Sequence, residues 1–182
     1  MLEKEGVDCI TIMDSAGTMT PKDAAAYTQA LKQAVKIPVG FHGHNNLGLS
    51  QANALAALES GVDELDCGLL GMARSAGNCS TELLVAVLEQ QKLSTGVDLW
   101  GLLQYLDEEL IPAMAQYNYK PAVAPIDLVL GMSGCHSNFL GMFKSVAEAY
   151  GVSLYQLITR VSSVDRKAPP KDLLESIAAT LK

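Results

Sequence analysis

The sequence feature that most constrains the fold is a repeated alternation of short apolar segments and helical patterns in the first half of the chain. Strands are predicted over residues 7–13, 37–42 and 64–70, and a polar or glycine-containing turn follows each of them. The helices that follow are predicted from Pro21 to about Val35, from about Leu49 to Glu59, and from about Thr81 to Gln90. Strand–helix units that recur every ~26 to 30 residues are typical of a parallel sheet covered by helices. The sequence therefore predicts an α/β fold.

The chain changes character near Leu99, after which it shows no further strand pattern. A proline-containing loop, which runs into the segment 131–138, is expected between the first and the second of the later helices. These helices are predicted over residues 99–115, 139–150, 153–160 and 171 to the end. We therefore predict two domains, residues 1–98 with the strands and residues 99–182 as a mostly helical domain.

Composition and charge exclude several classes of protein. The chain has 182 residues, of which 49% are hydrophobic and 18% are charged, as is typical of a globular protein with a core. A formal net charge of −7 and a pI near 4.9, without any basic run, argue against nucleic acid as a partner. The chain has neither a signal-peptide pattern nor an apolar run of ~20 residues, so we expect no membrane partner.

The four cysteines are widely spaced and form no C-x-x-C pair; they are Cys9, Cys67, Cys79 and Cys135. Most of them lie in or beside apolar or glycine-rich segments, where a buried free thiol is the ordinary interpretation. Free thiols are typical of a reducing compartment, so we expect a cytoplasmic protein.

Two of the three histidines, His42 and His44, stand one residue apart at the end of the second predicted strand. Side chains alternate between the two faces of a strand, so both imidazoles point the same way and can reach one metal ion. Neutral imidazole binds manganese, iron, zinc and similar ions, and two histidines do not select among them. Alternatively, one of them is a buried hydrogen-bonding histidine and the other is incidental. The polar turn that follows, Asn45-Asn46-Leu47-Gly48, favours a site.

Three further positions are candidates for a site, and each has a structural alternative. Asn78 ends a loop that contains three glycines, and it can offer an amide oxygen or simply cap the next helix. Ser15, after Asp14, can present a hydroxyl to a substrate carboxylate, or both residues can bond local backbone groups in a turn. His136 is the third histidine, and a single histidine is more often structural than catalytic.

Three motifs together resemble those of the metal-dependent TIM-barrel lyases that include the isopropylmalate synthases, and most of all the 4-hydroxy-2-oxovalerate aldolases among them. The motifs are His42-x-His44-Asn-Asn-Leu-Gly-Leu-x-x-Ala-Asn53, Gly71-Met-x-x-x-Ala-Gly77-Asn78 and Asp14-Ser15-x-Gly17. The second half is similar to the communication domain of these aldolases, which docks an acylating acetaldehyde dehydrogenase, in the pattern Gly131-x-x-Gly134-x-x-Ser137-x-Phe139-Leu140. By this resemblance, the chain holds the C-terminal three βα units of a (β/α)8 barrel, followed by a helical communication domain.

The resemblance also implies the chemistry of the site. His42 and His44 would be ligands of a divalent ion, usually Mn²⁺, and Asn78 would be a further metal ligand. His42 and Ser15 would contact the substrate, with Ser15 on its carboxylate. The implied reaction cleaves a 4-hydroxy-2-oxoacid, such as 4-hydroxy-2-oxopentanoate, to pyruvate and an aldehyde in the catabolism of aromatic compounds. The metal would act as a Lewis acid on the 2-oxoacid.

The sequence departs from this family in two respects. Residues 1–5 are predicted to be the last turn of a helix that Gly6 caps, and we expect that a preceding barrel segment carries the metal-binding aspartate, its neighbouring arginine and the histidine base. The chain would then be an incomplete enzyme. His136 stands where the family has a tyrosine that contacts substrate, so His136 is expected to bind substrate and to act as a substitute acid–base group.

A partial barrel would expose the edges of its outer strands, so we expect it to self-associate or to form an oligomer. Two other functions are compatible with the sequence. One is an interaction module that docks an acylating aldehyde dehydrogenase without catalysing a reaction. The other is a fragment of a Claisen-type acyl-CoA synthase such as isopropylmalate synthase, which explains the histidines but fits the second half less well.

Overall fold

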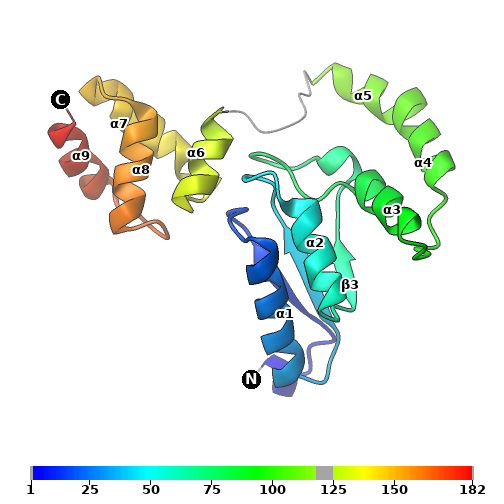
Figure 1. Cartoon of the computed structure of the whole chain (residues 1–182). Helices are drawn as coiled ribbons and strands as arrows, with labels where there is room; N and C mark the ends of the chain where they lie inside the picture. Colours follow the sequence, from blue (N-terminus) through cyan, green and yellow to red (C-terminus); the bar gives the residue numbers. More distant parts are fainter. Residues whose placement is uncertain (1, 118–124, 182) are drawn as a thin grey trace.

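The computed structural model describes residues 2–117 and 125–181, and its first half is a parallel sheet with helices (Figure 1). Three strands are hydrogen-bonded in the order β1-β2-β3, with both pairings parallel; they are β1 (Ile10–Asp14), β2 (Val39–Gly43) and β3 (Glu64–Asp66). The connections between them are the helices α1 (Pro21–Ala34) and α2 (Ser50–Glu59). The predicted α/β architecture is confirmed.

Helix α1 begins where the sequence predicts, because its first residues satisfy the free backbone N–H groups. The Thr20 hydroxyl accepts a hydrogen bond from the N–H of Asp23, and the Asp23 carboxylate accepts one from the N–H of Thr20 at 2.9 Å. Pro21 at the first helical position has no N–H to satisfy. The apolar faces of α1 and α2 pack against one face of the sheet, and the buried members of this core are Ala24, Val39, Phe41, Ala57 and Val62.

The other face of the sheet carries polar and exposed side chains. The register places Thr11 and Met13 of β1 on it, together with Glu64 and Asp66 of β3, and all four are exposed. His42 of β2 lies between Met13 and Asp66 in the same row. Among the described residues, neither β1 nor β3 pairs with a further strand along its outer edge. Whether these edges mediate self-association stays a prediction.

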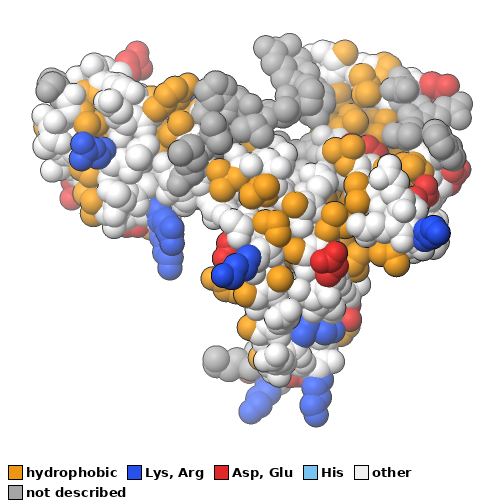
Figure 2. Space-filling model, in the orientation of Figure 1, with side chains coloured by type: hydrophobic (Ala, Val, Ile, Leu, Met, Phe, Trp, Pro, Cys, Tyr) orange, Lys and Arg blue, Asp and Glu red, His pale blue; other side chains and the backbone are white. Residues whose placement is uncertain are grey.

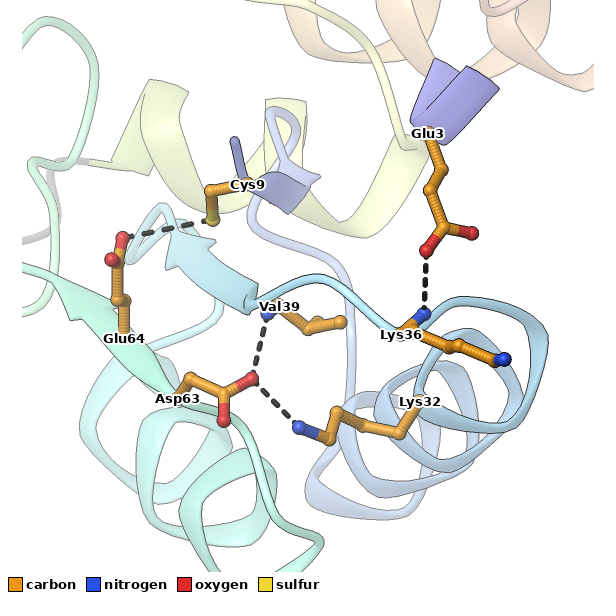
Figure 3. A network of polar contacts seen from close by, with 7 residues as sticks. All are labelled: Glu3, Cys9, Lys32, Lys36, Val39, Asp63 and Glu64. Atoms are coloured by element: carbon orange, nitrogen blue, oxygen red, sulfur yellow. Dashed lines mark hydrogen bonds and ion pairs between the residues drawn. The ribbon is translucent and has the colours of Figure 1, made fainter. Parts of the chain in front are cut away.

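Polar contacts fix the amino ends of β2 and β3 (Figure 3). One carboxylate oxygen of Asp63, the residue before β3, accepts hydrogen bonds from the N–H of Val39 and from Lys32 Nζ, both at 2.7 Å. Lys32 lies in the last turn of α1. The three groups therefore join the start of β3 to the start of β2 and to the end of the preceding helix.

The chain starts with a 3-10 turn, Leu2–Glu5, where the last turn of a helix was expected. Gly6 follows in a left-handed conformation with φ of +83°, as expected of a residue that ends a helical turn. The Glu3 carboxylate accepts a hydrogen bond from the N–H of Lys36 at 3.0 Å, which holds this turn beside the end of α1 (Figure 3).

All three strands are shorter than the sequence predicts, and β2 only by one residue. β1 starts at Ile10, not at residue 7, and β3 stops at Asp66, not at residue 70. Leu69–Gly71 is a 3-10 turn in which Leu70 has φ of +55° and Gly71 has φ of +62°. Left-handed backbone cannot continue a strand, so the predicted strand cannot run through this turn despite its apolar sequence.

Most helices of the second half match their predictions. The helix expected over residues 99–115 is present as α4 (Leu99–Tyr105), a π-helical turn (Leu106–Leu110) and α5 (Ile111–Ala115). The other predicted helices of this half are α7 (Leu140–Tyr150), α8 (Leu154–Val164) and α9 (Lys171–Thr180), and α3 (Thr81–Gln90) of the first half also matches its prediction.

Helix α6 (Pro125–Ser133) is an element that the sequence did not predict, since a proline-containing loop was expected there. Part of that expected loop, including Pro121, lies outside the described residues. The prolines and glycines of this region are local turn signals, but Leu130 is fully buried against the helices that follow. Burial of apolar side chains outweighs weak helix propensity, and Pro125 suits the first position of a helix.

Helices α6, α7, α8 and α9 enclose a hydrophobic core of their own and form a separate cluster in Figure 1. Its largest fully buried side chains are Leu130, Phe143, Leu157, Ile158 and Leu174. Helix α4 packs on α3, on the other side of the sheet region. The boundary between residues 98 and 99 stays a prediction.

All four cysteines are free thiols, as expected. None of the helices in residues 2–117 and 125–181 is long and apolar enough to cross a membrane.

Candidate metal centre

His42 and His44 lie at the carboxyl end of β2, with their side chains next to each other. Both residues are buried, each with 8% of its surface exposed. Their ring centroids are 5.2 Å apart, and the ring planes meet at 73°. The alternation of side chains along a strand predicts this pairing, since residues two apart share a face. The geometry places two imidazoles where one ion can contact both.

Asp66 holds the ring of His42 in place from the neighbouring strand. His42 Nδ1 lies 2.9 Å from Asp66 Oδ2, and the register of β2 and β3 places the two residues directly opposite each other. A carboxylate that accepts the Nδ1 proton leaves Nε2 as the free nitrogen for a metal. Sequence reasoning missed Asp66, because only the pairing register shows that it faces His42.

The loop after β3 brings Asn78 to the histidines. Its backbone runs back along the end of β2, where Cys79 N–H donates to the carbonyl of Gly43 at 3.1 Å and His44 forms an isolated bridge with Asn78. The helix-capping alternative for Asn78 does not apply, because α3 has Ser80 as its N-cap. Asn78 therefore lies beside His44.

Two buried polar atoms in this group have no hydrogen-bond partner in the described part of the chain. They are His44 Nδ1 and Asn78 Oδ1. Buried polar atoms are nearly always satisfied, and the exceptions call for an explanation such as an unseen ion. Nitrogen and amide-oxygen atoms are suitable ligands for a divalent metal ion, so these residues fit the metal site that the sequence predicts.

The glycines of the loop after β3 allow its backbone to pack closely against itself. A Cβ atom on Gly77, which has φ of +84°, would lie 2.3 Å from the carbonyl oxygen of Gly71. The N–H of Asn78 donates to that same oxygen at 3.0 Å. Gly71 and Gly77 therefore have a structural role in this loop.

Asp14 and Ser15 lie at the same edge of the sheet, after β1. The two carboxylate oxygens of Asp14 accept hydrogen bonds from the N–H groups of Thr18 and Met19, each at 3.0 Å. The backbone carbonyl of Asp14 accepts the N–H of His44 at 3.2 Å. Asp14 therefore fits the structural alternative of a turn residue, whereas the side chain of Ser15 is exposed.

His136 meets the loop after β3 through a cluster that the sequence did not indicate. Arg74 Nη1 donates to Asn138 Oδ1 at 2.9 Å, and Arg74 Nη2 lies 3.1 Å from His136 Nε2. The other ring nitrogen, His136 Nδ1, accepts the backbone N–H of Asn138 at 3.1 Å. Burial lowers the pKa of His136 below its ordinary value, and the charge of Arg74 adds to the effect.

The pKa of His44 is also lowered. Burial is the largest cause, and the nearby His42 and Arg74 add to it, with a smaller contribution from His136. A lowered pKa favours the neutral imidazole, which is the form that binds metal.

The two halves of the chain also touch at Asn46. A Cβ atom on Gly17 would lie 2.6 Å from Asn46 N, and one on Gly131 of α6 would lie 2.8 Å from Asn46 Cβ. The Asn46 amide donates to the Ser75 hydroxyl at 2.8 Å. Helix α6 is therefore seated directly on the loop that follows the histidines.

In the residues that the structure describes, no group of three or more His, Cys, Asp and Glu side chains could hold a metal ion. The candidate centre therefore consists of two imidazoles and an amide. A cavity of about 500 Å³ adjoins it and is lined by residues that include Asn45, Gly71, Asn78, Leu83 and Ile111. A larger, mainly apolar cavity of about 720 Å³ lies between α2 and α3, away from the histidines. Figure 2 shows apolar side chains spread over that region.

A family profile described as HMGL-like matches residues 1–108. The 4-hydroxy-2-oxovalerate aldolase of Chloroflexus aggregans is 39% identical over 181 residues, which cover 100% of this chain and 52% of the relative. The protein of the same name from Roseiflexus castenholzii is 38% identical and covered to 53%. The chain thus spans about half the length of these curated relatives.

Among solved structures, the carboxyl transferase domain of Rhizobium etli pyruvate carboxylase with 3-hydroxypyruvate is similar, with a TM-score of 0.77. The match covers 100% of this chain and 33% of that one, at 22% sequence identity. At this identity the likeness concerns the fold alone.

Proposed function

The chain belongs to the HMGL-like family, and from this membership we infer that it is the histidine-bearing part of a metal-dependent pyruvate aldolase. The proposed reaction cleaves 4-hydroxy-2-oxoacids, such as 4-hydroxy-2-oxopentanoate, to pyruvate and an aldehyde. The observation that carries the proposal is the buried pair His42 and His44 with Asn78, in which two polar atoms have no partner among the described residues. The names of the relatives supply the reaction class.

His42, His44 and Asn78 would hold the ion, Mn²⁺ or another divalent metal. When bound, such an ion acts as a Lewis acid that polarises the keto oxygen of a 2-oxoacid. Asp66 fixes the ring of His42, so the free Nε2 of His42 is already oriented before a metal ion binds. The exposed hydroxyl of Ser15 at the same sheet edge would donate to the substrate carboxylate.

His136 would contact the substrate from the helical half of the chain and is the candidate acid–base group. Both of its ring nitrogens face N–H donors, from Asn138 and from Arg74. This arrangement suits the binding of an anion better than the uptake of a proton. Its catalytic role stays a prediction.

A complete site is proposed to need a further barrel segment, because the family barrel has eight strands and also supplies a carboxylate ligand and a base. The chain on its own would then be an incomplete aldolase. Residues 99–182, which include helices α6, α7, α8 and α9, would be the communication domain and would dock an acylating acetaldehyde dehydrogenase. A role in the catabolism of aromatic compounds is part of the same proposal.

Metal binding is the direct test. Isothermal titration with Mn²⁺ is expected to show one site per chain, and His44→Ala should weaken binding by at least tenfold, since it removes one ligand. Tyr155→Ala, which truncates an exposed ring on α8, is the matched control and should bind like the wild type. If His44→Ala and Tyr155→Ala bind Mn²⁺ equally well, the proposed centre is wrong.

The reaction is tested separately. Wild-type chain is incubated with Mn²⁺, pyruvate and an aldehyde, alone and with the part of the Chloroflexus aggregans relative that the alignment leaves uncovered. Aldol product formed only in the mixture is the expected result. Product from the chain alone would contradict its incompleteness, and a metal-binding chain that is inactive in both cases would favour the interaction module.

A further inference from the structure

Arg74 is a cation held in place without a carboxylate partner among the residues that the structure describes. Its guanidinium contacts Asn138 and His136, both from the helical half of the chain, at 2.9 and 3.1 Å. The ion pairs found in the described residues involve Lys32, His42 and Lys171, and none involves Arg74. In a chain with a net charge of −7, a fixed guanidinium that forms no ion pair with any described acidic group points to an external anion.

His136 is surrounded by one more hydrogen-bond donor than its ring can accept from. Neutral imidazole has one N–H and one acceptor nitrogen, yet both ring nitrogens face donors, the N–H of Asn138 and Arg74 Nη2. If Nδ1 accepts from Asn138, the proton sits on Nε2 and points at Arg74. Two N–H groups then converge, and an oxygen anion placed between them would accept from both.

The position of Arg74 and His136 relative to the metal centre determines which anionic group they would bind. The sheet order is β1-β2-β3, with Ser15 after β1, His42 and His44 at the end of β2, and Arg74 in the loop after β3. This loop lies against the histidine segment, because the N–H of Gly77 donates to the carbonyl of Arg74 at 3.2 Å and the carbonyl of Gly77 accepts the N–H of Asn45 at 2.8 Å. A 2-oxoacid with its carboxylate at Ser15 and its keto group at the histidines would extend its far end towards Arg74.

We propose that Arg74 and His136 bind a second carboxylate, carried by the aldehyde half of the substrate, and that the chain therefore acts on dicarboxylic 4-hydroxy-2-oxoacids. This inference rests on the proposed function, because the metal centre sets the direction in which the substrate lies. Two converging N–H donors match the two oxygens of a carboxylate. Asn138 is a positioning residue, since it holds Arg74 through its side-chain oxygen and His136 through its backbone N–H.

Two non-cleavable 2-oxoacids with the same carbon skeleton test the inference. 2-Oxoglutarate ends in a carboxylate and 2-oxopentanoate ends in a methyl group. Isothermal titration of the Mn²⁺-loaded chain is expected to show that 2-oxoglutarate binds about tenfold more tightly, the contribution of a charge-assisted hydrogen bond. Arg74→Gln should reduce this ratio to near one, and Arg74→Lys, which keeps the charge without the planar fork, should give an intermediate ratio.

Arg160→Gln, an exposed arginine on α8, is the matched control and should keep the tenfold ratio. Circular dichroism of each variant checks that it is folded, as expected for substitutions at exposed positions. Equal affinities in the wild type, or a preference that persists in Arg74→Gln, would overturn the inference and leave the aldolase proposal standing. If neither acid binds the Mn²⁺-loaded chain, the proposed function is wrong and this inference falls with it.

Discussion

At the scale of single residues, the candidate centre depends on a few side chains whose partners lie on other elements. His42 contacts Asp66 across two strands, and Asn78 reaches His44 through a loop that closes on itself. A buried imidazole without such a partner can rotate and choose either tautomer. The carboxylate of Asp66 removes this freedom and makes His42 a better ligand.

Substituting Asp66 by Asn is expected to weaken Mn²⁺ binding about tenfold or more, the usual cost of losing a carboxylate that orients a metal-binding histidine. The measurement is isothermal titration with Mn²⁺. Glu64→Gln is the control, because Glu64 lies two residues earlier on the same exposed face of β3 and does not contact a histidine. Equal losses in both variants would mean that bulk negative charge matters and the contact with His42 does not.

At the scale of elements, helices are fixed mainly by local signals and strands by their neighbours. α1 carries its own capping box, whereas β3 is held to β2 by a contact that involves α1 as well. The pKa of Asp63 is lowered chiefly by its hydrogen bond with Lys32 and further by the N–H of Val39. This carboxylate therefore stabilises the fold only while it is ionised.

The sign of the resulting pH dependence follows from linkage. A lowered pKa means that the folded state binds fewer protons than the unfolded state in acid, so stability rises with pH. The contribution of Asp63 is expected to be present above the ordinary carboxyl pKa of about 4 and lost as the pH falls through the lower, folded value. Urea denaturation should show Asp63→Asn to be less stable than the wild type at pH 7, with the difference vanishing in strong acid. A difference that is the same at both pH values would contradict this account.

At the scale of the whole molecule, the two halves meet at the candidate centre. Gly131 of α6 touches Asn46, and Arg74 joins the loop after β3 to His136 and Asn138. Because these contacts lie beside the histidines, the position of the helical half determines what surrounds them.

Replacing Gly131 by Ala is expected to destabilise the chain by about 1–3 kcal/mol, because the new methyl group would overlap Asn46. Gly141→Ala is the matched control, since Gly141 also lies in a helix and has nothing within 4 Å of its Cβ position. That substitution should stabilise the chain by about 0.5–1 kcal/mol through helix propensity. Denaturation curves in urea compare the two. A stabilising Gly131→Ala would show that α6 does not rest on Asn46 in solution.

The sequence alone determined what depends on local chemistry. The alternation of strands and helices, the capping of α1 by Thr20 and the placement of His42 and His44 on one side of a strand all follow from residue type and spacing. Such features need no knowledge of distant neighbours. They predicted the α/β fold and the histidine pair at the centre of the candidate site.

Only the tertiary structure decided which distant residues meet. Helix α6 forms in a region of turn signals because Leu130 is buried, and the third strand cannot extend to residue 70 because Leu70 takes a left-handed conformation. Asp66 opposite His42 depends on strand register, and Arg74 beside His136 joins residues 62 positions apart. No local pattern encodes these contacts, because each arises from packing between elements that the sequence separates.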